Sequence, residues 1–459
     1  MTLLRRCILG VALLGLVPGA RPQGILSQIL TNGPTAKRIN IVFLSEGYLP
    51  SQTNQFASDV GRALAGMIRT PPFDAYSNYF NAFTIFVPSV EAGSDHPSTG
   101  VFKDTYFNSS YDSYGIARLI TIPPNDRDGT YANGQGKVNL LLQNLMPEYD
   151  LSVLIVNDAQ YGGSGGSPLI ASVNASSAEI ATHELGHTYS GLGDEYDAAY
   201  PGYPDTEEPN TTRQTNRTLI KWTTWILPST PVPTPETPAY AALVGLFEGA
   251  HYHATAWYRP KLDCKMNHLG VPFCEICSEA LVKSTYHLVH PIESNSPSTN
   301  AVINLIDPQT GTFAIERPRP ATYDLSVQWF TNNIAVPGAT NGQFTIAASA
   351  LPSGTNLVKV EVSDPTTKVR NDPLQVLKDS RTWRVNVQLR PVLGALRAQD
   401  KIVLSWPASS SGFVLESKTG LDPGTPWSPT GLSPVLVGNR LTVTNLIGTG
   451  SEYYRLRQQ

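Results

Sequence analysis

The stretch from Ser176 to Tyr196 decides the fold and reads SSAEIATHELGHTYSGLGDEY. Its centre, His183-Glu184-Leu185-Gly186-His187, is an HExxH motif. Residues four apart lie one above the other on an α-helix, so both imidazoles can face a single metal ion. The glutamate follows the first histidine and can reach an activated water without binding the metal. The motif therefore predicts a metal-dependent hydrolytic site on a helix.

The residues on either side of the motif support a helix. Ser176-Ser177-Ala178-Glu179 fits a capping box, in which Ser176 and Glu179 satisfy the first backbone donors. Gly191 is a natural residue for the helix end. We therefore expect a helix over about 177–190. The alternative interpretation is a buried helix that carries two histidines and no metal.

A catalytic zinc ion needs a third protein ligand and one open position for water. The metzincin pattern HExxHxxGxxH has a glycine that lets the chain turn back toward the metal. Here Gly191-x-x-Asp194 repeats the glycine-to-ligand step one residue later. Asp194 is therefore the expected third ligand of one catalytic Zn²⁺. Glu195 is the alternative, and a ligand from elsewhere in the chain is a further one.

Two residues further along the chain complete the expected site. Met266 is the one methionine after the motif and could form an apolar floor under the metal, although a lone methionine is usually ordinary core. The tetrahedral oxyanion of peptide hydrolysis needs a hydrogen-bond donor. Tyr258 precedes Met266 by eight residues and is the catalytic candidate for that role. A packing aromatic is the alternative for Tyr258.

The composition excludes several classes of protein. The chain has 459 residues, of which 15% are charged, well below the ~25% of an average soluble protein. Glycine and proline contribute 37 residues each, which suits a loop-rich and β-rich chain and argues against a coiled coil or helical solenoid. The net charge of −4 makes a nucleic-acid partner improbable.

The first residues have the pattern of a secretory signal. Arg5 and Arg6 precede the apolar run Cys7–Val17, and small residues follow it. We therefore expect a signal peptide over 1–24 and a secreted, extracellular or cell-surface protein. An uncleaved anchor or a buried helix is the alternative. No later segment is long and apolar enough to predict a transmembrane span.

Strand and helix patterns divide the remainder into three parts. Residues 25–290 alternate strand candidates with helical patterns and predict an α/β catalytic domain. Within it, Tyr161–Gly166 (YGGSGG) is expected to be a flexible loop. Short alternating strands over 297–390 predict an Ig-like β-sandwich module, and a C-terminal β module is expected over 391–459.

Three cysteines follow the expected signal, namely Cys264, Cys274 and Cys277. In an exported protein the default expectation is one disulfide and one odd thiol. The alternative is a structural metal site with His268 or His287 as the fourth ligand.

Nine ordered blocks of this chain resemble the M64 peptidases, the IgA peptidase family. The resemblance covers roughly residues 27–285. The blocks are NGP (Asn32–Pro34), RINIVFLSEGY (Arg38–Tyr48), PFDAYSNYFN (Pro72–Asn81), YGGSGG (Tyr161–Gly166), HELGHTYSGLGDEY (His183–Tyr196), GLFEGAHY (Gly245–Tyr252), YRP (Tyr258–Pro260), CKM (Cys264–Met266) and PFCEIC (Pro272–Cys277).

The resemblance implies a secreted zinc metalloendopeptidase that hydrolyses protein or peptide substrates. The step from Gly191 to Asp194 and the methionine at Met266 predict a metzincin-like fold for its catalytic domain. By position, His183 and His187 match the family's zinc ligands, Glu184 its catalytic glutamate, and Asp194 the block that supplies the third ligand. In that mechanism Glu184 takes a proton from a zinc-activated water.

Two alternatives to this function stay open. One is a surface- or polymer-binding protein with a degenerate protease domain, in which the β modules make the contact. The other is a zinc hydrolase of non-protein amides.

Overall fold

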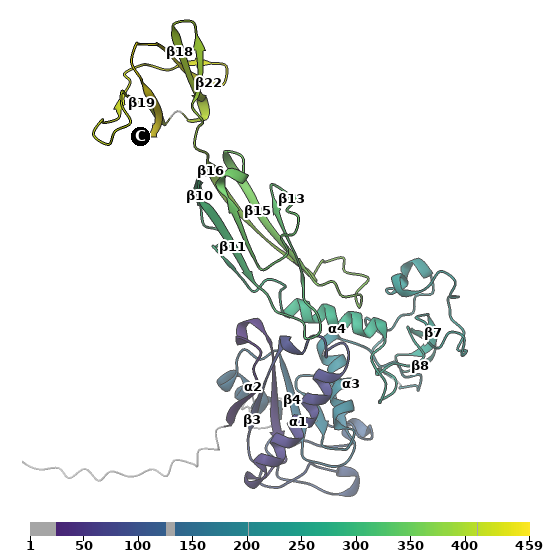
Figure 1. The fold of residues 1–459 in the computed structure, drawn as a ribbon. Helices are drawn as coiled ribbons and strands as arrows, with labels where there is room; N and C mark the ends of the chain where they lie inside the picture. Colours follow the sequence, from purple (N-terminus) through teal and green to yellow (C-terminus); the bar gives the residue numbers. More distant parts are fainter. Residues whose placement is uncertain (1–23, 125–133, 201, 411) are drawn as a thin grey trace, which may run out of the picture. The chain divides into compact units, whose positions relative to one another are not determined.

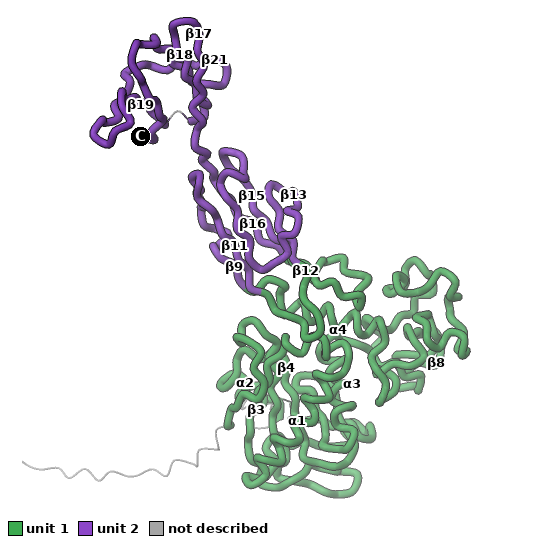
Figure 2. The backbone as a smooth tube through the Cα atoms, viewed as in Figure 1, with its two compact units in different colours: residues 1–293, 317–326, 362–379 green, residues 294–316, 327–361, 380–459 purple. Residues whose placement is uncertain are grey.

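A computed structural model describes residues 24–124, 134–200, 202–410 and 412–459. The chain forms two compact units (Figure 2). Unit 1 comprises the chain up to Glu293 together with Arg317–Ser326 and Val362–Asp379, and unit 2 comprises the remaining residues from Ser294 onward. The expected signal peptide over 1–24 lies, except for Gly24, outside the described residues.

Unit 1 is built on a six-stranded sheet in the order β1-β3-β2-β4-β6-β5. Neighbouring strands from β3 to β6 pair in parallel, and the outer strands β1 and β5 pair antiparallel. Every residue of β2, β3 and β4 is buried, which explains why apolar residues predominate on both faces of these strands. The strands are β1 (Ile25–Leu30), β2 (Ile39–Glu46), β3 (Phe80–Phe86), β4 (Leu151–Val156), β5 (Gly163–Ser164) and β6 (Leu169–Ser172).

Helices cover both faces of this sheet (Figure 1). On β2, Ile41 and Phe43 point to a core that includes buried residues of α1 (Thr53–Arg69), α3 (Ser177–Ser190) and α4 (Glu275–Leu288). The alternate residues Val42 and Leu44 point to a second core with α2 (Gly134–Leu145). The predicted mixed α/β content of this domain is therefore confirmed. A hairpin of β7 (Phe247–Ala250) and β8 (His253–Arg259) completes the regular elements of unit 1.

Two downstream segments belong to unit 1 because they bind its surface through buried polar contacts. The carboxylate of Asp364 accepts hydrogen bonds from the hydroxyls of Tyr76 (2.7 Å), Tyr286 (2.8 Å) and Tyr323 (3.0 Å). One acceptor thus joins a loop of the α/β domain, helix α4 and both downstream segments. The compact unit therefore extends beyond the predicted end of the catalytic domain at residue 290.

Unit 2 consists of strands in four sheets. The first two sheets enclose Phe313, Trp329 and Trp383, and the other two enclose Trp406 and its neighbours. The strands of the first pair are β9 (Ser294–Ser296), β10 (Ile303–Ile306), β11 (Thr310–Glu316), β12 (Ser326–Thr331), β13 (Ile334–Ala335), β14 (Gln343–Ala347), β15 (Gly354–Ser363) and β16 (Lys378–Gln388). Those of the second pair are β17 (Gly394–Ala398), β18 (Lys401–Pro407), β19 (Phe413–Lys418), β20 (Ser428–Pro429), β21 (Val435–Val437), β22 (Arg440–Leu446) and β23 (Tyr453–Gln458).

In the part of the chain that the structure describes, no helix has both the length and the hydropathy that a bilayer span requires.

Candidate metal centre

Helix α3 carries the HExxH motif and has the predicted bounds, Ser177–Ser190. Gly191 ends the helix with a φ of 62°, a conformation that glycine adopts at little cost. The predicted capping box is wrong, because the Ser176 side chain makes no capping hydrogen bond. Glu179 instead pairs with Lys265 and accepts the backbone N–H of Gly270 at 2.8 Å. This glutamate therefore ties the helix to the turn that contains Met266.

Three potential metal ligands converge beside the helix. Asp194 Oδ1 lies 3.1 Å from His183 Nε2 and 3.4 Å from His187 Nε2. The two Nε2 atoms are 3.2 Å apart. Tetrahedral ligands at about 2.0–2.1 Å from a zinc ion lie about 3.3 Å from one another, so one ion fits between these atoms.

Backbone carbonyls fix which ring nitrogen of each histidine faces the centre. His183 Nδ1 donates to the carbonyl of Lys265 at 2.8 Å, and His187 Nδ1 donates to that of Leu192 at 2.6 Å. Because Nδ1 of each ring is bonded to a carbonyl, Nε2 is the nitrogen that faces the centre. This is the arrangement that orients histidine ligands in metal sites.

The two oxygens of Asp194 have different surroundings. Oδ2 accepts the hydroxyl of Tyr252 at 2.5 Å, whereas the buried Oδ1 has no hydrogen-bond partner. Burial opposes the charge of this carboxylate, but the two imidazoles hold the pKa of Asp194 well below its usual value. A buried, ionised oxygen that faces two imidazole Nε2 atoms fits a cation held between the three groups. The residues present therefore suit a metal of the zinc type.

Glu184 is part of helix α3, and its side chain lies close to Gly165 at the edge of the sheet. The backbone N–H of Gly165 donates to its carboxylate, and burial raises the pKa of Glu184 against the attraction of the two imidazoles. A Cβ at Gly165 would lie 3.3 Å from Glu184 Oε2, so the strand edge approaches closely because this residue is glycine. The predicted loop at Tyr161–Gly166 is partly wrong, because it contains strand β5.

Asp194 and Glu195 point into different clusters. Asp194 lies with the two histidines, whereas Glu195 lies with the three cysteines. Asn210 holds this turn, since it accepts the N–H of Gly193 at 2.7 Å and donates to Glu195 Oε1 at 2.9 Å. The N–H of Glu195 donates to the carbonyl of Met266 at 2.9 Å. These bonds direct two adjacent carboxylates to opposite sides of the backbone.

Met266 is fully buried and packs under helix α3. A Cβ at Gly186 would lie only 2.8 Å from Met266 Sδ, so the helix and the turn touch at a residue without a side chain. The apolar contact under the motif was expected from the sequence.

The substitution Gly186→Ala is expected to destabilise the protein although alanine favours helices. Overpacking costs about 1–3 kcal/mol, while the gain in helix propensity is about 0.5–1 kcal/mol. Gly61→Ala on α1 is the matched control, because Gly61 is an exposed helical residue whose added Cβ meets nothing within 4 Å. Urea unfolding should show a loss for Gly186→Ala and a gain for Gly61→Ala. Equal gains in both variants would contradict the packing described.

The predicted oxyanion donor Tyr258 lies on β8, where its backbone pairs with Thr212. Among the described residues, no hydrogen bond, ion pair or ring contact joins Tyr258 to the histidine cluster. Two other tyrosines do contact it. Tyr252 binds Asp194, and the Tyr196 ring stacks on that of His183 with centroids 6.2 Å apart. Tyr196 is the last residue of the block that contains the motif, so its position near the site could be predicted. The contact of Tyr252 could not, because Tyr252 is far from the motif in the chain.

The expected disulfide is absent from the structure, in which Cys264, Cys274 and Cys277 are all free and buried. Neither predicted histidine joins them. His268 is largely exposed and pairs with Asp263 at 3.2 Å, and His287 is exposed on α4. The carboxylate of Glu195 is the fourth group of this cluster.

Two imidazoles and a carboxylate around one point, with a second carboxylate beside them, are a donor set suited to a metal ion and a neighbouring proton acceptor. Comparison with protein families gives the particular class. The model of the IgA peptidase M64 family matches residues 27–240 and 236–285, more than half of the chain. The chain belongs to the M64 peptidase family, whose members are metallopeptidases. The predicted family is therefore confirmed.

Other comparisons add little to this result. A search of curated proteins gives no match. Among solved structures, a chimeric titin Z1Z2 carrying a KLER peptide from decorin is 11% identical, with a TM-score of 0.15, over 34% of this chain and 90% of that one. The titin I-band fragment I67–I69 is 10% identical, with a TM-score of 0.18, over 34% of this chain and 60% of that one. At these TM-scores neither likeness bears on the fold.

Proposed function

We propose that this M64 peptidase is a secreted, zinc-dependent endopeptidase. The observation that carries the proposal is the convergence of His183 Nε2, His187 Nε2 and the buried Asp194 Oδ1 within 3.4 Å of one another. These three residues would hold one catalytic ion. Secretion rests on the charged and apolar pattern of the first residues.

The side chains have separate tasks in the proposed reaction. A bound zinc ion supplies Lewis-acid activation of a water molecule and of the scissile carbonyl. Glu184 takes a proton from the attacking water and later delivers it to the leaving amine. The N–H of Gly165 holds that carboxylate in place, and Lys265 O and Leu192 O orient the imidazoles. An oxyanion role for Tyr258 stays a prediction without a supporting contact.

A pocket lined in part by Gly165, the neighbour of Glu184, is the candidate site for a substrate side chain. Its volume is about 530 Å³, and Ser164, Gly165 and Ile170 are among its lining residues. The outer edge of β5 at Gly163 is already bridged to Leu119, so a substrate strand cannot pair there. We therefore propose that a substrate side chain occupies this pocket, and that the substrate backbone passes Gly165 without pairing with β5 at Gly163. We do not propose immunoglobulin A as the substrate, because the name of the family does not identify what this chain cleaves.

We also propose a metzincin-like arrangement for the catalytic domain and Ig-like sandwiches for unit 2. The first rests on Met266 beneath the motif helix, and the second on paired sheets around Trp329 and Trp383. A protein substrate is the proposed partner. Contact of the β modules with a surface or polymer is a further proposal, and no nucleic-acid partner is proposed.

Casein digestion tests the proposed function. The purified protein should cleave casein, lose the activity with 1,10-phenanthroline, and regain it when zinc is added. A peptide library cleaved by the same protein should then report the residue that occupies the pocket at Gly165. Cleavage unaffected by the chelator would overturn the metal mechanism. Binding of a polymer without cleavage by the zinc-loaded protein would instead support the binding-protein alternative.

A further inference from the structure

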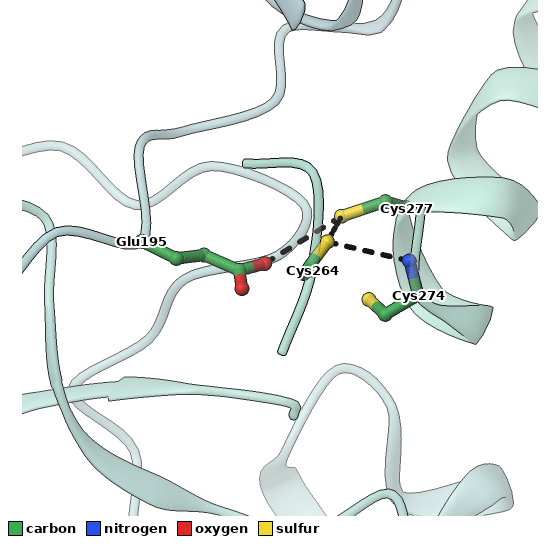
Figure 3. A group of neighbouring side chains, drawn as sticks. All are labelled: Glu195, Cys264, Cys274 and Cys277. Atoms are coloured by element: carbon green, nitrogen blue, oxygen red, sulfur yellow. Dashed lines mark hydrogen bonds between the residues drawn. The ribbon is translucent and has the colours of Figure 1, made fainter. Parts of the chain in front are cut away.

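A second group of ligand-type side chains lies apart from the histidine cluster. It consists of Glu195, Cys264, Cys274 and Cys277, and each residue is buried (Figure 3). Three separate segments supply them. Glu195 comes from the turn after α3, Cys264 begins the turn that contains Met266, and Cys274 and Cys277 lie at the start of α4.

The separations of these atoms agree with a four-coordinate metal. Cys264 Sγ and Cys277 Sγ are 3.6 Å apart, and Cys277 Sγ is 3.6 Å from Glu195 Oε1. All four ligand atoms lie within 4.8 Å of one another. A tetrahedral ion with Zn–S of about 2.3 Å and Zn–O of about 2.0 Å would place two sulfurs about 3.8 Å apart and sulfur and oxygen about 3.5 Å apart.

The carboxylate of Glu195 lacks the partners that a buried charge requires. Its side chain is fully buried, and Oε2 has no hydrogen-bond partner. Among the described residues, no lysine or arginine forms an ion pair with it. A buried carboxylate is expensive without a counter-charge, and a metal held by the neighbouring sulfurs would supply one.

The surroundings already orient these ligands. Asn210 donates to Glu195 Oε1 at 2.9 Å, and the backbone N–H of Cys274 donates to Cys264 Sγ at 3.3 Å. The N-terminus of α4 also favours negative charge on the sulfurs of Cys274 and Cys277. Outer-shell hydrogen bonds of this kind are typical of metal ligands.

We propose that Glu195, Cys264, Cys274 and Cys277 form a second, structural metal site that takes a thiophilic divalent ion such as zinc. Four protein ligands close the coordination shell, so this ion has no open position for water and takes no part in the chemistry. Binding replaces the protons of the three thiols, which are released to solvent. No oxidant or reductant is needed.

The site would stabilise the catalytic centre next to it. Glu195 follows Asp194 directly in the chain, and Cys264 precedes Lys265, whose carbonyl binds His183. A metal that joins these segments fixes the two turns that position Asp194 and the first histidine. It would do so in place of the expected disulfide.

Cobalt loading of a chain without the catalytic ligands tests the proposal independently of peptidase activity. We expect the full-length variant His183→Ala/His187→Ala to bind one equivalent of Co²⁺ with thiolate-to-cobalt charge-transfer absorption. Adding Cys277→Ser or Glu195→Gln should weaken binding at least tenfold. Adding Glu275→Gln should change nothing, because Glu275 lies beside these cysteines but pairs with Lys261 at 2.7 Å.

The unsubstituted protein provides a second measurement that does not depend on a variant folding. Titration of its thiols with a mercurial should release one equivalent of zinc, and peptide mapping without reductant should find all three cysteines unlinked. A Cys264–Cys277 disulfide in the purified protein would overturn the proposal. So would a double-histidine variant that binds no cobalt or binds it without charge-transfer absorption.

Discussion

We expect Glu184→Gln to lower kcat/KM for peptide hydrolysis by about 10²- to 10⁴-fold while the protein keeps its catalytic metal. The amide cannot accept the proton of the attacking water, but it can still accept the N–H of Gly165 that holds Glu184 in place. Since Glu184 is outside the group of three ligand atoms, the substitution should leave the metal site intact. Peptide cleavage and bound zinc should be measured on the same preparation.

The matched control is Glu91→Gln, which changes a half-exposed glutamate that pairs with Lys103. This variant should keep full activity. If Glu184→Gln were fully active, the assignment of the general base would be wrong. A loss of zinc together with activity would instead place Glu184 among the ligands.

The second large effect is expected for Asp194→Ala. Removal of this carboxylate leaves two imidazoles to hold the ion, so affinity for the catalytic metal should fall by more than about 100-fold and activity should be lost. Metal affinity can be followed by competition with a chromogenic chelator, and activity by peptide cleavage at saturating zinc. Asp197→Ala, three residues further along the same turn and exposed, should change neither quantity.

Substitution of the neighbouring Glu195 distinguishes the two alternatives for the third ligand, Asp194 and Glu195. Glu195 points toward the cysteines, so Glu195→Ala should not remove the ion held by His183 and His187. If Asp194→Ala kept the catalytic metal and Glu195→Ala lost it, the proposed ligand set would be wrong.

Local patterns predicted the motif helix well. The bounds of α3 follow from helical spacing and from Gly191, and the buried strands β2 and β4 follow from short, mainly apolar segments. Asp194 could be singled out because its distance from the helix end is fixed by a short turn. These features depend on contacts between residues close together in the chain.

Contacts between distant segments were not predictable in this way. Glu179 does not cap its helix but pairs with Lys265, which lies 86 residues further along the chain. Tyr252 donates to Asp194, from which it is separated by 58 residues. The sequence showed three crowded cysteines but not that Glu195 joins them, because the approach depends on how the turn around Asn210 folds. The same limit applies to the segments around Tyr323 and Asp364, which join unit 1 through tyrosine hydroxyls.

Anomalous scattering at the zinc edge, measured on crystals of the active protein, tests the central claim most directly. The account predicts a peak about 2.0–2.2 Å from His183 Nε2, His187 Nε2 and Asp194 Oδ1. An active crystal with no ion between these three atoms, or with the ion held by other residues, would contradict it.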